Sequence, residues 1–189
     1  MAKFVIQYIL NNFVFVKNEV NMVILGIDPG LAIVGWGVVE YDKGKFYVRG
    51  YGSIQTKAGL PVEERLLQIF DGMNTIIDKY KPEVMAVEEL FWNTNQKTGI
   101  SVAEARGTIL LSAHRKGLKI NEYTPLQVKQ AVVGYGRAEK KQVIAMVTSI
   151  LKLPKPPKPD DTADALAIAI CHAHSSGGVN RLITELKSR

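Results

Sequence analysis

The sequence predicts a single α/β domain in which helices flank a mixed sheet. Its first part contains three strand-like segments joined by short glycine-containing turns, which favours an antiparallel meander. These segments comprise residues 23–28, 33–42 and 45–54. A strand, a helix and a second strand follow at residues 84–90, 101–117 and 119–123, in the order of a right-handed parallel crossover. A chain of 189 residues is long enough for one such core and too short for two ordinary domains.

Helical periodicity accounts for most of the remaining core. Residues 60–80 carry apolar side chains at intervals of three and four residues, with Pro61 and acidic residues at their start, as expected for an amphipathic helix. Further helical segments follow the crossover, and the proline-rich linker KLPKPPKP precedes the last of them. These helices are expected at residues 125–133, 138–152 and 161–174.

The two ends of the chain are expected to lie outside this core. Residues 1–21 contain an apolar run that Asn11 and Asn12 interrupt. Its apolar pieces are too short for a membrane span, and no small-residue cleavage site follows them. Met22 directly precedes the first convincing strand. We therefore expect an extension at residues 1–21, a core at 22–174 and a polar tail at 175–189.

Net charge and cysteine content narrow the class of protein. The formal net charge of +6 suggests an anionic partner, and nucleic acid is the commonest such partner. The single cysteine, Cys171, lies in an apolar stretch and excludes an internal disulfide framework. A reducing cytoplasm is therefore the expected compartment.

Acidic residues stand where the predicted strands end and where the last helix begins. Asp28 ends the first strand, and Glu88 and Glu89 end the first strand of the crossover. Ligands gather at the carboxyl ends of parallel strands, so these acids are expected at one edge of the sheet. Asp161 and Asp164 are three residues apart and thus share one helical face. Clustered carboxylates repel one another unless a cation lies between them, and their oxygen atoms suit Mg²⁺ or Mn²⁺ in phosphoryl chemistry.

Each acid also has a purely structural interpretation. Asp-Pro-Gly is a common turn sequence, so Asp28 need only be a turn residue. Asp161 and Asp164 can stabilise the start of a helix through its dipole. Glu88 and Glu89 can form a solvated strand end, and the alternation of that strand does not choose between them. Convergence of these acids on one sheet edge is what favours a metal site.

Five sequence motifs follow one another in order, namely ILGIDPG, VEELFWNTN, AEARGTILLSA, EYTPLQVKQAVVGYGRAEKKQV and KLPKPPKPDDTADALAIAICHAH. Together they closely resemble those of RuvC, the bacterial Holliday junction resolvase (crossover junction endodeoxyribonuclease) family, from Met22 to about His174. The resemblance implies an RNase H-like fold, with a mixed five-stranded sheet flanked by helices. It also implies a homodimer that resolves four-way DNA junctions in recombination and repair by paired symmetric cuts. The branch-migration proteins RuvA and RuvB are the implied partners.

The resemblance also assigns roles to the acids. It implies that the catalytic residues, which are also the metal ligands, are Asp28, Glu88, Asp161 and Asp164. Glu88 is preferred to Glu89 on this ground alone, and some relatives carry histidine at the position of Asp161. The implied cofactor is a pair of Mg²⁺ ions per subunit, for which Mn²⁺ can substitute. The implied reaction is phosphodiester hydrolysis that leaves a 5′-phosphate and a 3′-hydroxyl.

The same resemblance suggests residues that bind DNA. Lys129 and Lys140 match family lysines that support catalysis or junction binding. Phe91 matches an aromatic residue that contacts bases near the junction centre, where one stacked base contributes about 1–3 kcal/mol. Arg137 and Lys141 add positive charge and are expected to contact phosphates. The structural alternatives are a solvated helix surface for the lysines and an apolar loop against the partner subunit for Phe91.

Three other functions fit parts of the pattern. Another nuclease of the same fold, such as an RNA:DNA hybrid hydrolase, would use the same acids. A catalytically inert junction-binding module would not need four acids on a basic surface. A sugar-kinase or actin-like ATPase would need a second, duplicated domain, for which the chain is too short.

Overall fold

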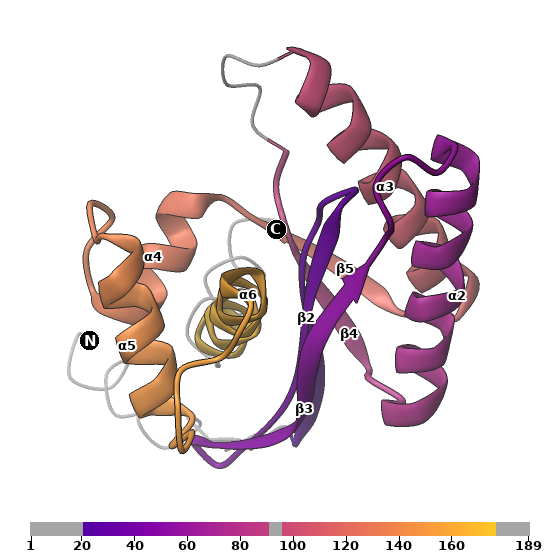
Figure 1. Ribbon diagram of the computed structural model, residues 1–189. Helices are drawn as coiled ribbons and strands as arrows, with labels where there is room; N and C mark the ends of the chain where they lie inside the picture. The colour runs from indigo at the N-terminus through magenta and orange to yellow at the C-terminus, as the bar shows by residue number, and fades with distance from the viewer. Residues whose placement is uncertain (1–20, 91–95, 177–189) are drawn as a thin grey trace, which may run out of the picture.

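The computed structural model describes residues 21–90 and 96–176 as one five-stranded sheet with helices on both faces (Figure 1). The strands are β1 (Met22–Asp28), β2 (Ile33–Asp42), β3 (Lys45–Gln55), β4 (Val84–Glu88) and β5 (Lys119–Tyr123). The helices are α2 (Val62–Tyr80), α3 (Gln96–Arg115), α4 (Pro125–Val133), α5 (Lys140–Ile150) and α6 (Asp160–Ser176). No helix in this part of the chain is long and apolar enough to cross a membrane.

The sheet is mixed, and its strand order is β3-β2-β1-β4-β5. The first three strands form the predicted antiparallel meander, and β4 and β5 run parallel to β1. Ile27 is paired with Val87 in the register of β1 and β4, so the carboxyl ends of these two strands lie side by side. The predicted mixed five-stranded sheet is confirmed.

Two apolar cores lie on opposite faces of the sheet. Helices α2 and α3 cover one face, and α4, α5 and α6 cover the other (Figure 1). Alternation along the central strands divides their side chains between the two cores. Ile24 and Ala86 belong to the core on the α6 face, whereas Leu25 and Val87 belong to the core under α2 and α3. Strands β1 and β4 are therefore apolar on both faces, as is usual for inner strands of a parallel sheet.

Helix α6 lies directly on β1 and β2 and is buried along most of its length. Glycines on the strands make this close approach possible, because a β-carbon at Gly26 or Gly35 would overlap main-chain oxygen atoms of α6. The Thr162 hydroxyl also donates a hydrogen bond of 3.1 Å to the carbonyl oxygen of Gly52 on β3. These contacts hold the first turn of α6 over the ends of the meander strands.

The observed elements differ from the predicted ones mainly at their ends. Helix α5 covers Lys140–Ile150 rather than residues 138–152. It begins after Glu139, whose N–H donates a hydrogen bond of 2.8 Å to Oε1 of Gln142 in the first turn. Strand β4 ends at Glu88, two residues before the predicted end. Helix α3 begins at Gln96 instead of residue 101.

The predicted extension and tail fall largely outside the described residues. Helix α6 continues to Ser176, two residues beyond its predicted end, so the proposed tail at 175–189 begins within a helical turn. The structure does not describe residues 1–20 or 177–189. The predicted extension at 1–21 therefore stays a prediction.

Candidate active site

Two acidic side chains end the neighbouring parallel strands β1 and β4. Asp28 and Glu88 continue the alternation of Ile24 and Ala86, so both carboxylates lie on the α6 face of the sheet. Glu89 follows the end of β4 and is exposed. Of the two glutamates, Glu88 is therefore the one that lies beside Asp28.

The first turn of α6 brings two further acids to the same edge. Asp28 is paired with Gly35 in the β1–β2 register, and Gly35 lies against the backbone of Asp161. Asp161 and Asp164 both interact electrostatically with Asp28. Thus the four acids predicted from the sequence converge, although they come from three elements that are far apart along the chain.

Burial and the neighbouring acids raise the pKa values of Asp28 and Glu88. Burial raises the pKa of Asp28 to about 8, and repulsion from Glu88, Asp164 and Asp161 adds to this effect. Burial, followed by repulsion from Asp164, also raises the pKa of Glu88. Lys140 opposes both shifts. Two partly buried carboxylates that resist ionisation next to other acids are typical of a functional site.

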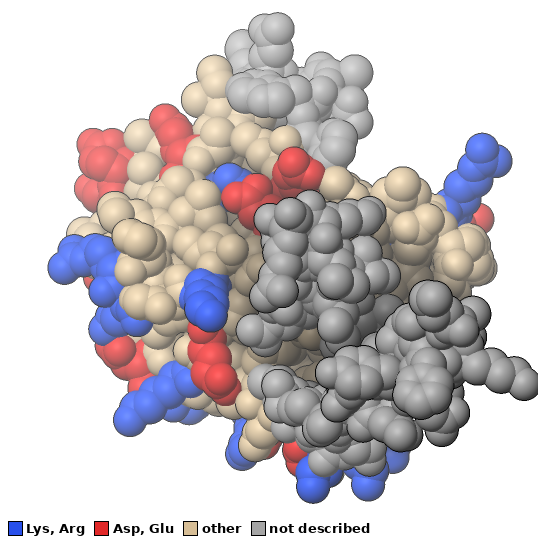
Figure 2. All heavy atoms as spheres, turned by 180° about the vertical axis from the view of Figure 1, so that it is seen from behind, with Lys and Arg blue, Asp and Glu red and all other residues tan. Residues whose placement is uncertain are grey.

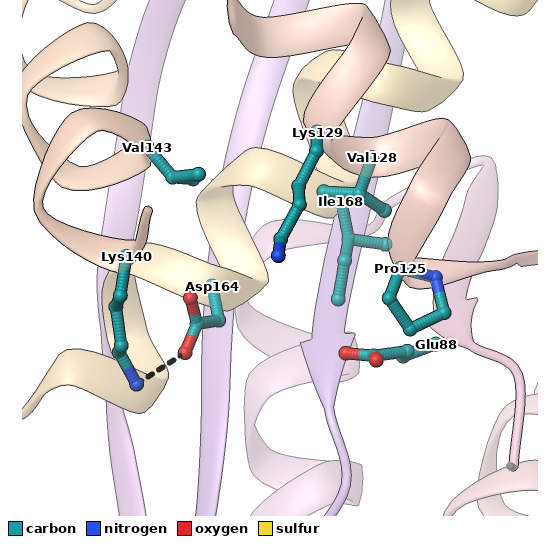
Figure 3. A pocket seen from close by; sticks show the side chains of 8 residues that line it. All are labelled: Glu88, Pro125, Val128, Lys129, Lys140, Val143, Asp164 and Ile168. Atoms are coloured by element: carbon teal, nitrogen blue, oxygen red, sulfur yellow. Dashed lines mark ion pairs between the residues drawn. The ribbon is translucent and has the colours of Figure 1, made fainter. Parts of the chain in front are cut away.

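A pocket of about 250 Å³ opens beside Glu88 and Asp164 (Figure 3). Its lining consists of Glu88, Pro125, Val128, Lys129, Lys140, Val143, Asp164 and Ile168. The Lys140 ammonium lies 2.9 Å from Asp164 Oδ2, and this hydrogen bond is the main reason that the pKa of Lys140 is raised. The Lys129 side chain extends from α4 toward the space between Asp164 and Glu88. The pocket therefore combines two acids with two amines.

The donor set fits a hard divalent cation in its chemistry. All four candidate ligands are carboxylates, the ligand type that Mg²⁺ and Mn²⁺ prefer, and a cation between them would relieve the repulsion that raises the pKa of Asp28. Within residues 21–90 and 96–176, no three Asp, Glu, His or Cys side chains already converge on one metal position. Asp164 instead pairs with Lys140. Metal binding would thus exchange this ion pair for a metal–carboxylate contact.

The other predicted DNA-binding residues lie outside this pocket. Arg137 is exposed in the segment between α4 and α5, and Lys141 is exposed at the start of α5. Phe91 lies outside the described residues. On the face seen in Figure 2, basic side chains are spread around the described surface instead of forming one continuous patch. Lys129 and Lys140 are therefore the predicted basic residues that lie beside the acids.

Sequence reasoning missed Arg106. This α3 residue forms an ion pair with Glu122 on β5 and donates a hydrogen bond of 3.4 Å to the main-chain oxygen of Glu88. The available signal was a lone arginine among small and apolar residues in AEARGTILLSA. Sequence reasoning also missed the hydrogen bond between the Tyr123 hydroxyl and Nδ1 of buried His172, at 2.7 Å.

Comparison with known proteins reveals close relatives. The model of the family "Crossover junction endodeoxyribonuclease RuvC" matches residues 24–172. A curated protein with that description from Caldanaerobacter subterraneus is 56% identical over 161 residues, which cover 85% of this chain and 98% of the relative. Another from Halothermothrix orenii is 58% identical over 154 residues, covering 82% and 93% of the two chains.

Solved structures agree with the sequence comparison. Thermus thermophilus RuvC superposes with a TM-score of 0.76 at 38% identity, covering 82% of this chain and 95% of that chain. The same protein in complex with a Holliday junction substrate gives 0.77 at 38% identity, covering 80% and 93%. The yeast mitochondrial Holliday junction resolvase Ydc2, at 12% identity and a TM-score of 0.62, shares the fold.

The mixed sheet and the acids at its edge define an endonuclease domain of RNase H-like fold. The chain belongs to the RuvC family of crossover junction endodeoxyribonucleases. The predicted family, fold class and phosphodiester-hydrolysing activity are thereby confirmed. RuvC nucleases depend on a metal, in agreement with the carboxylate donor set.

Proposed function

We propose that this protein is a magnesium-dependent resolvase that cuts four-way DNA junctions by paired symmetric incisions during recombination and repair in the cytoplasm. The observation that carries the proposal is the convergence of Asp28 and Glu88, at neighbouring strand ends, with the acids of α6. The pocket beside these acids, with its two lysines, supports it further. The junction complex solved for the Thermus relative supports the same class of substrate.

The proposed ligands of two Mg²⁺ ions, or of Mn²⁺ in their place, are Asp28, Glu88, Asp161 and Asp164. When bound, such ions activate water and stabilise the leaving oxygen of a phosphodiester, which leaves a 5′-phosphate and a 3′-hydroxyl. The protein itself orients the phosphate. Lys140 holds Asp164 in the free protein and is released to bind a phosphate oxygen as the carboxylate turns away. Lys129 reaches the same pocket from α4 and contacts the phosphate from the other side.

Charge outside the pocket is proposed to hold the arms of the junction. Arg137 and Lys141 lie on and beside α5 and would contact phosphates without reading base sequence. Phe91 is expected to stack on a base at the junction centre, as the family resemblance implies. Phe91→Ala should therefore slow cutting more than it weakens binding.

A homodimer would present two active sites to the two strands of like polarity in a junction. A face of α3 supports this assembly, because Ile100 and Leu111 are 57% and 55% exposed and lie on the same side of the helix as Gly107. A β-carbon at Gly107 would meet no atom within 4 Å. This small residue between two exposed apolar ones leaves room for the α3 helix of a second copy. RuvA and RuvB are the further partners that family membership suggests.

The proposal is tested with a labelled synthetic four-way junction and a linear duplex of equal length, each incubated with Mg²⁺ or with EDTA. Paired symmetric nicks in the junction, present only with Mg²⁺, are the expected result. Equal cutting of the duplex or of an RNA:DNA hybrid would instead indicate another nuclease of this fold. Junction binding without any cleavage would indicate an inert binding module.

The dimer is tested by sedimentation of two matched variants. Leu111→Glu introduces a charge on the α3 face, whereas Leu126→Glu changes an equally exposed leucine on α4, also at 55%. Leu111→Glu should yield monomers and Leu126→Glu should leave the dimer intact. Dimers in both variants would show that the α3 face is not the interface.

A further inference from the structure

The peptide group that joins Glu88 to Glu89 is held on both sides. Its N–H, from Glu89, donates a hydrogen bond of 2.9 Å to the carbonyl oxygen of Tyr123 on β5. Its carbonyl oxygen, from Glu88, accepts the 3.4 Å hydrogen bond from Nε of Arg106. A peptide group bound at both polar atoms cannot rotate without losing one of them, so the direction of the Glu88 side chain is fixed with it.

The sheet itself offers no donor for the Glu88 carbonyl. The N–H of Glu89 points toward β5, so the carbonyl of Glu88 points toward β1 on the other side. Glu88 stands beside Asp28 in the parallel register that pairs Ile27 with Val87. The next donor along β1 would therefore be residue 29, which is Pro29 and has no N–H. Because Pro29 cannot donate, the Glu88 carbonyl oxygen accepts its hydrogen bond from Arg106 on α3 instead.

Arg106 is in turn held by Glu122. Their closest side-chain atoms, Nη2 and Oε2, are 2.7 Å apart, and the arginine side chain is 14% exposed while the glutamate is 46% exposed. Nη2 is buried and makes this contact without the alignment of a directed hydrogen bond. The ion pair therefore anchors the guanidinium mainly through charge. It also ties Arg106 to the β5 residue that directly precedes Tyr123.

The Arg106 contact acts through the backbone and not through the charge of the Glu88 carboxylate. Glu122 is paired with Val87, whose side chain faces α2 and α3, whereas the Glu88 carboxylate lies on the opposite face with α6. The cations that lower the pKa of Glu88 are Lys129 and Lys140, which lie on the α6 face. Arg106 thus approaches the end of β4 from the side opposite to the acids.

We propose that Arg106, anchored by Glu122, is a positioning residue that holds the end of β4 so that Glu88 faces the acids of β1 and α6. Its mechanistic consequence rests on the proposed function, because it presumes that these acids form the active site. Its structural part, the restraint of the Glu88–Glu89 peptide, does not depend on activity. Arg106 neither binds the phosphate nor belongs to the catalytic residues.

The test compares Arg106→Gln and Arg106→Lys with Lys116→Gln in the full-length protein. Lys116 lies just beyond the end of the same helix and forms an exposed ion pair with Asp78 on α2. Lys116→Gln is therefore a matched loss of a charge whose ion-pair partner is on a helix and not on β4 or β5. Hydrogen exchange of the Glu89 amide reports the restraint directly. Single-turnover cleavage of a four-way junction and metal-free junction affinity report its effect on catalysis.

Arg106→Gln should speed exchange at the Glu89 amide about tenfold, as expected for the loss of a hydrogen bond to a charged donor. It should slow cleavage about 10- to 100-fold through misplacement of a reacting group, and leave junction affinity within about twofold because phosphate contacts are unchanged. Arg106→Lys should be intermediate in exchange and in rate, since it retains the charge beside Glu122 but not the planar fork. Lys116→Gln should match the wild type.

Unchanged exchange at Glu89 in Arg106→Gln would overturn the proposal, whatever the activity. Faster exchange at the Glu89 amide in Arg106→Gln, combined with a wild-type cleavage rate, would also overturn the proposal. An equal loss of cleavage rate and of junction affinity in this variant would overturn it as well. If the wild-type protein cut no junction at all, the proposed function would fail, while the exchange measurement would still decide whether Arg106 restrains β4.

Discussion

Gly35 on β2 lies directly beneath Asp161 on α6, so that a β-carbon at Gly35 would overlap the main-chain oxygen of Asp161. Gly35 is also the partner of Asp28 across the β1–β2 pair. One contact between a helix and a strand therefore sets the spacing between acids from opposite ends of the chain.

Replacing Gly35 by alanine should push the first turn of α6 away from the sheet. Overpacking of this kind lowers the free energy of unfolding by about 1–3 kcal/mol, and cleavage should fall further because Asp161 moves away from Asp28. Denaturant unfolding and single-turnover cleavage measure the two effects. Ser53→Ala, opposite Gly35 on β3, is the control. Wild-type activity in Gly35→Ala would mean that this contact does not set the spacing.

The four acids can be tested by replacing each carboxylate with its amide. Asp28→Asn, Glu88→Gln, Asp161→Asn and Asp164→Asn should each reduce cleavage at least about 100-fold while junction binding persists, because metal ligation depends on the carboxylates and binding depends on phosphate contacts. Glu89→Gln should be mild, since Glu89 is exposed. An active Glu88→Gln with an inactive Glu89→Gln would reverse the assignment on β4.

Stability without metal should depend on the charge of Asp28. Its pKa is raised from 3.8 to about 8, so between these values the folded state holds a proton that the unfolded state releases, and the stability due to Asp28 is lost as pH rises toward 8. At pH 8 in EDTA, Asp28→Asn should therefore melt several degrees above the wild type. At pH 4 the two proteins should melt together. Equal melting temperatures at both pH values would contradict the raised pKa.

Asp28→Asn also distinguishes stabilisation by bound metal from stabilisation by removal of the Asp28 charge. A ligand that binds only the folded state raises the melting temperature as its concentration rises. Mg²⁺ added at pH 8 should therefore stabilise the wild type and have little effect on Asp28→Asn. Equal stabilisation of both proteins would remove Asp28 from the metal site.

Basic residues beside the acids should affect both DNA binding and cleavage, whereas basic residues outside the pocket should affect binding alone. Junction affinity should fall steeply as the salt concentration rises. The logarithm of the binding constant should decrease by about 0.9 per neutralised phosphate for each tenfold increase in salt. Lys129→Ala and Lys140→Ala should lower both this slope and the cleavage rate, because both lysines line the pocket. Lys141→Ala, on the exposed side of α5, should lower the slope alone. Equal affinity for junction and duplex at every salt concentration, without cleavage, would contradict the resolvase assignment.

Deletion of residues 1–21 should leave the domain folded and active, because β1 begins at Met22 and the family match begins at residue 24. Unfolding temperature, sedimentation and cleavage rate measure the effect. Loss of the dimer on deletion would show that the extension takes part in the interface.

Local sequence patterns were sufficient for much of the fold. The alternating segments, the glycine turns and the helical spacing of 60–80 predicted the order of the elements, and the motifs predicted the family. The spacing of Asp161 and Asp164 determined that they share a helical face, because one helical turn spans 3.6 residues. These features depend on contacts between neighbours along the chain, which is why sequence alone could predict them.

Tertiary structure decided which groups meet. Strand β4 is apolar on both faces, so alternation alone did not distinguish Glu88 from Glu89. That distinction came from the register with β1 and from the α6 helix that covers one face. The Lys140–Asp164 ion pair and the Arg106–Glu88 hydrogen bond likewise join residues from different helices and strands. Such contacts depend on how the layers stack, and a single sequence carries no local periodicity that encodes that stacking.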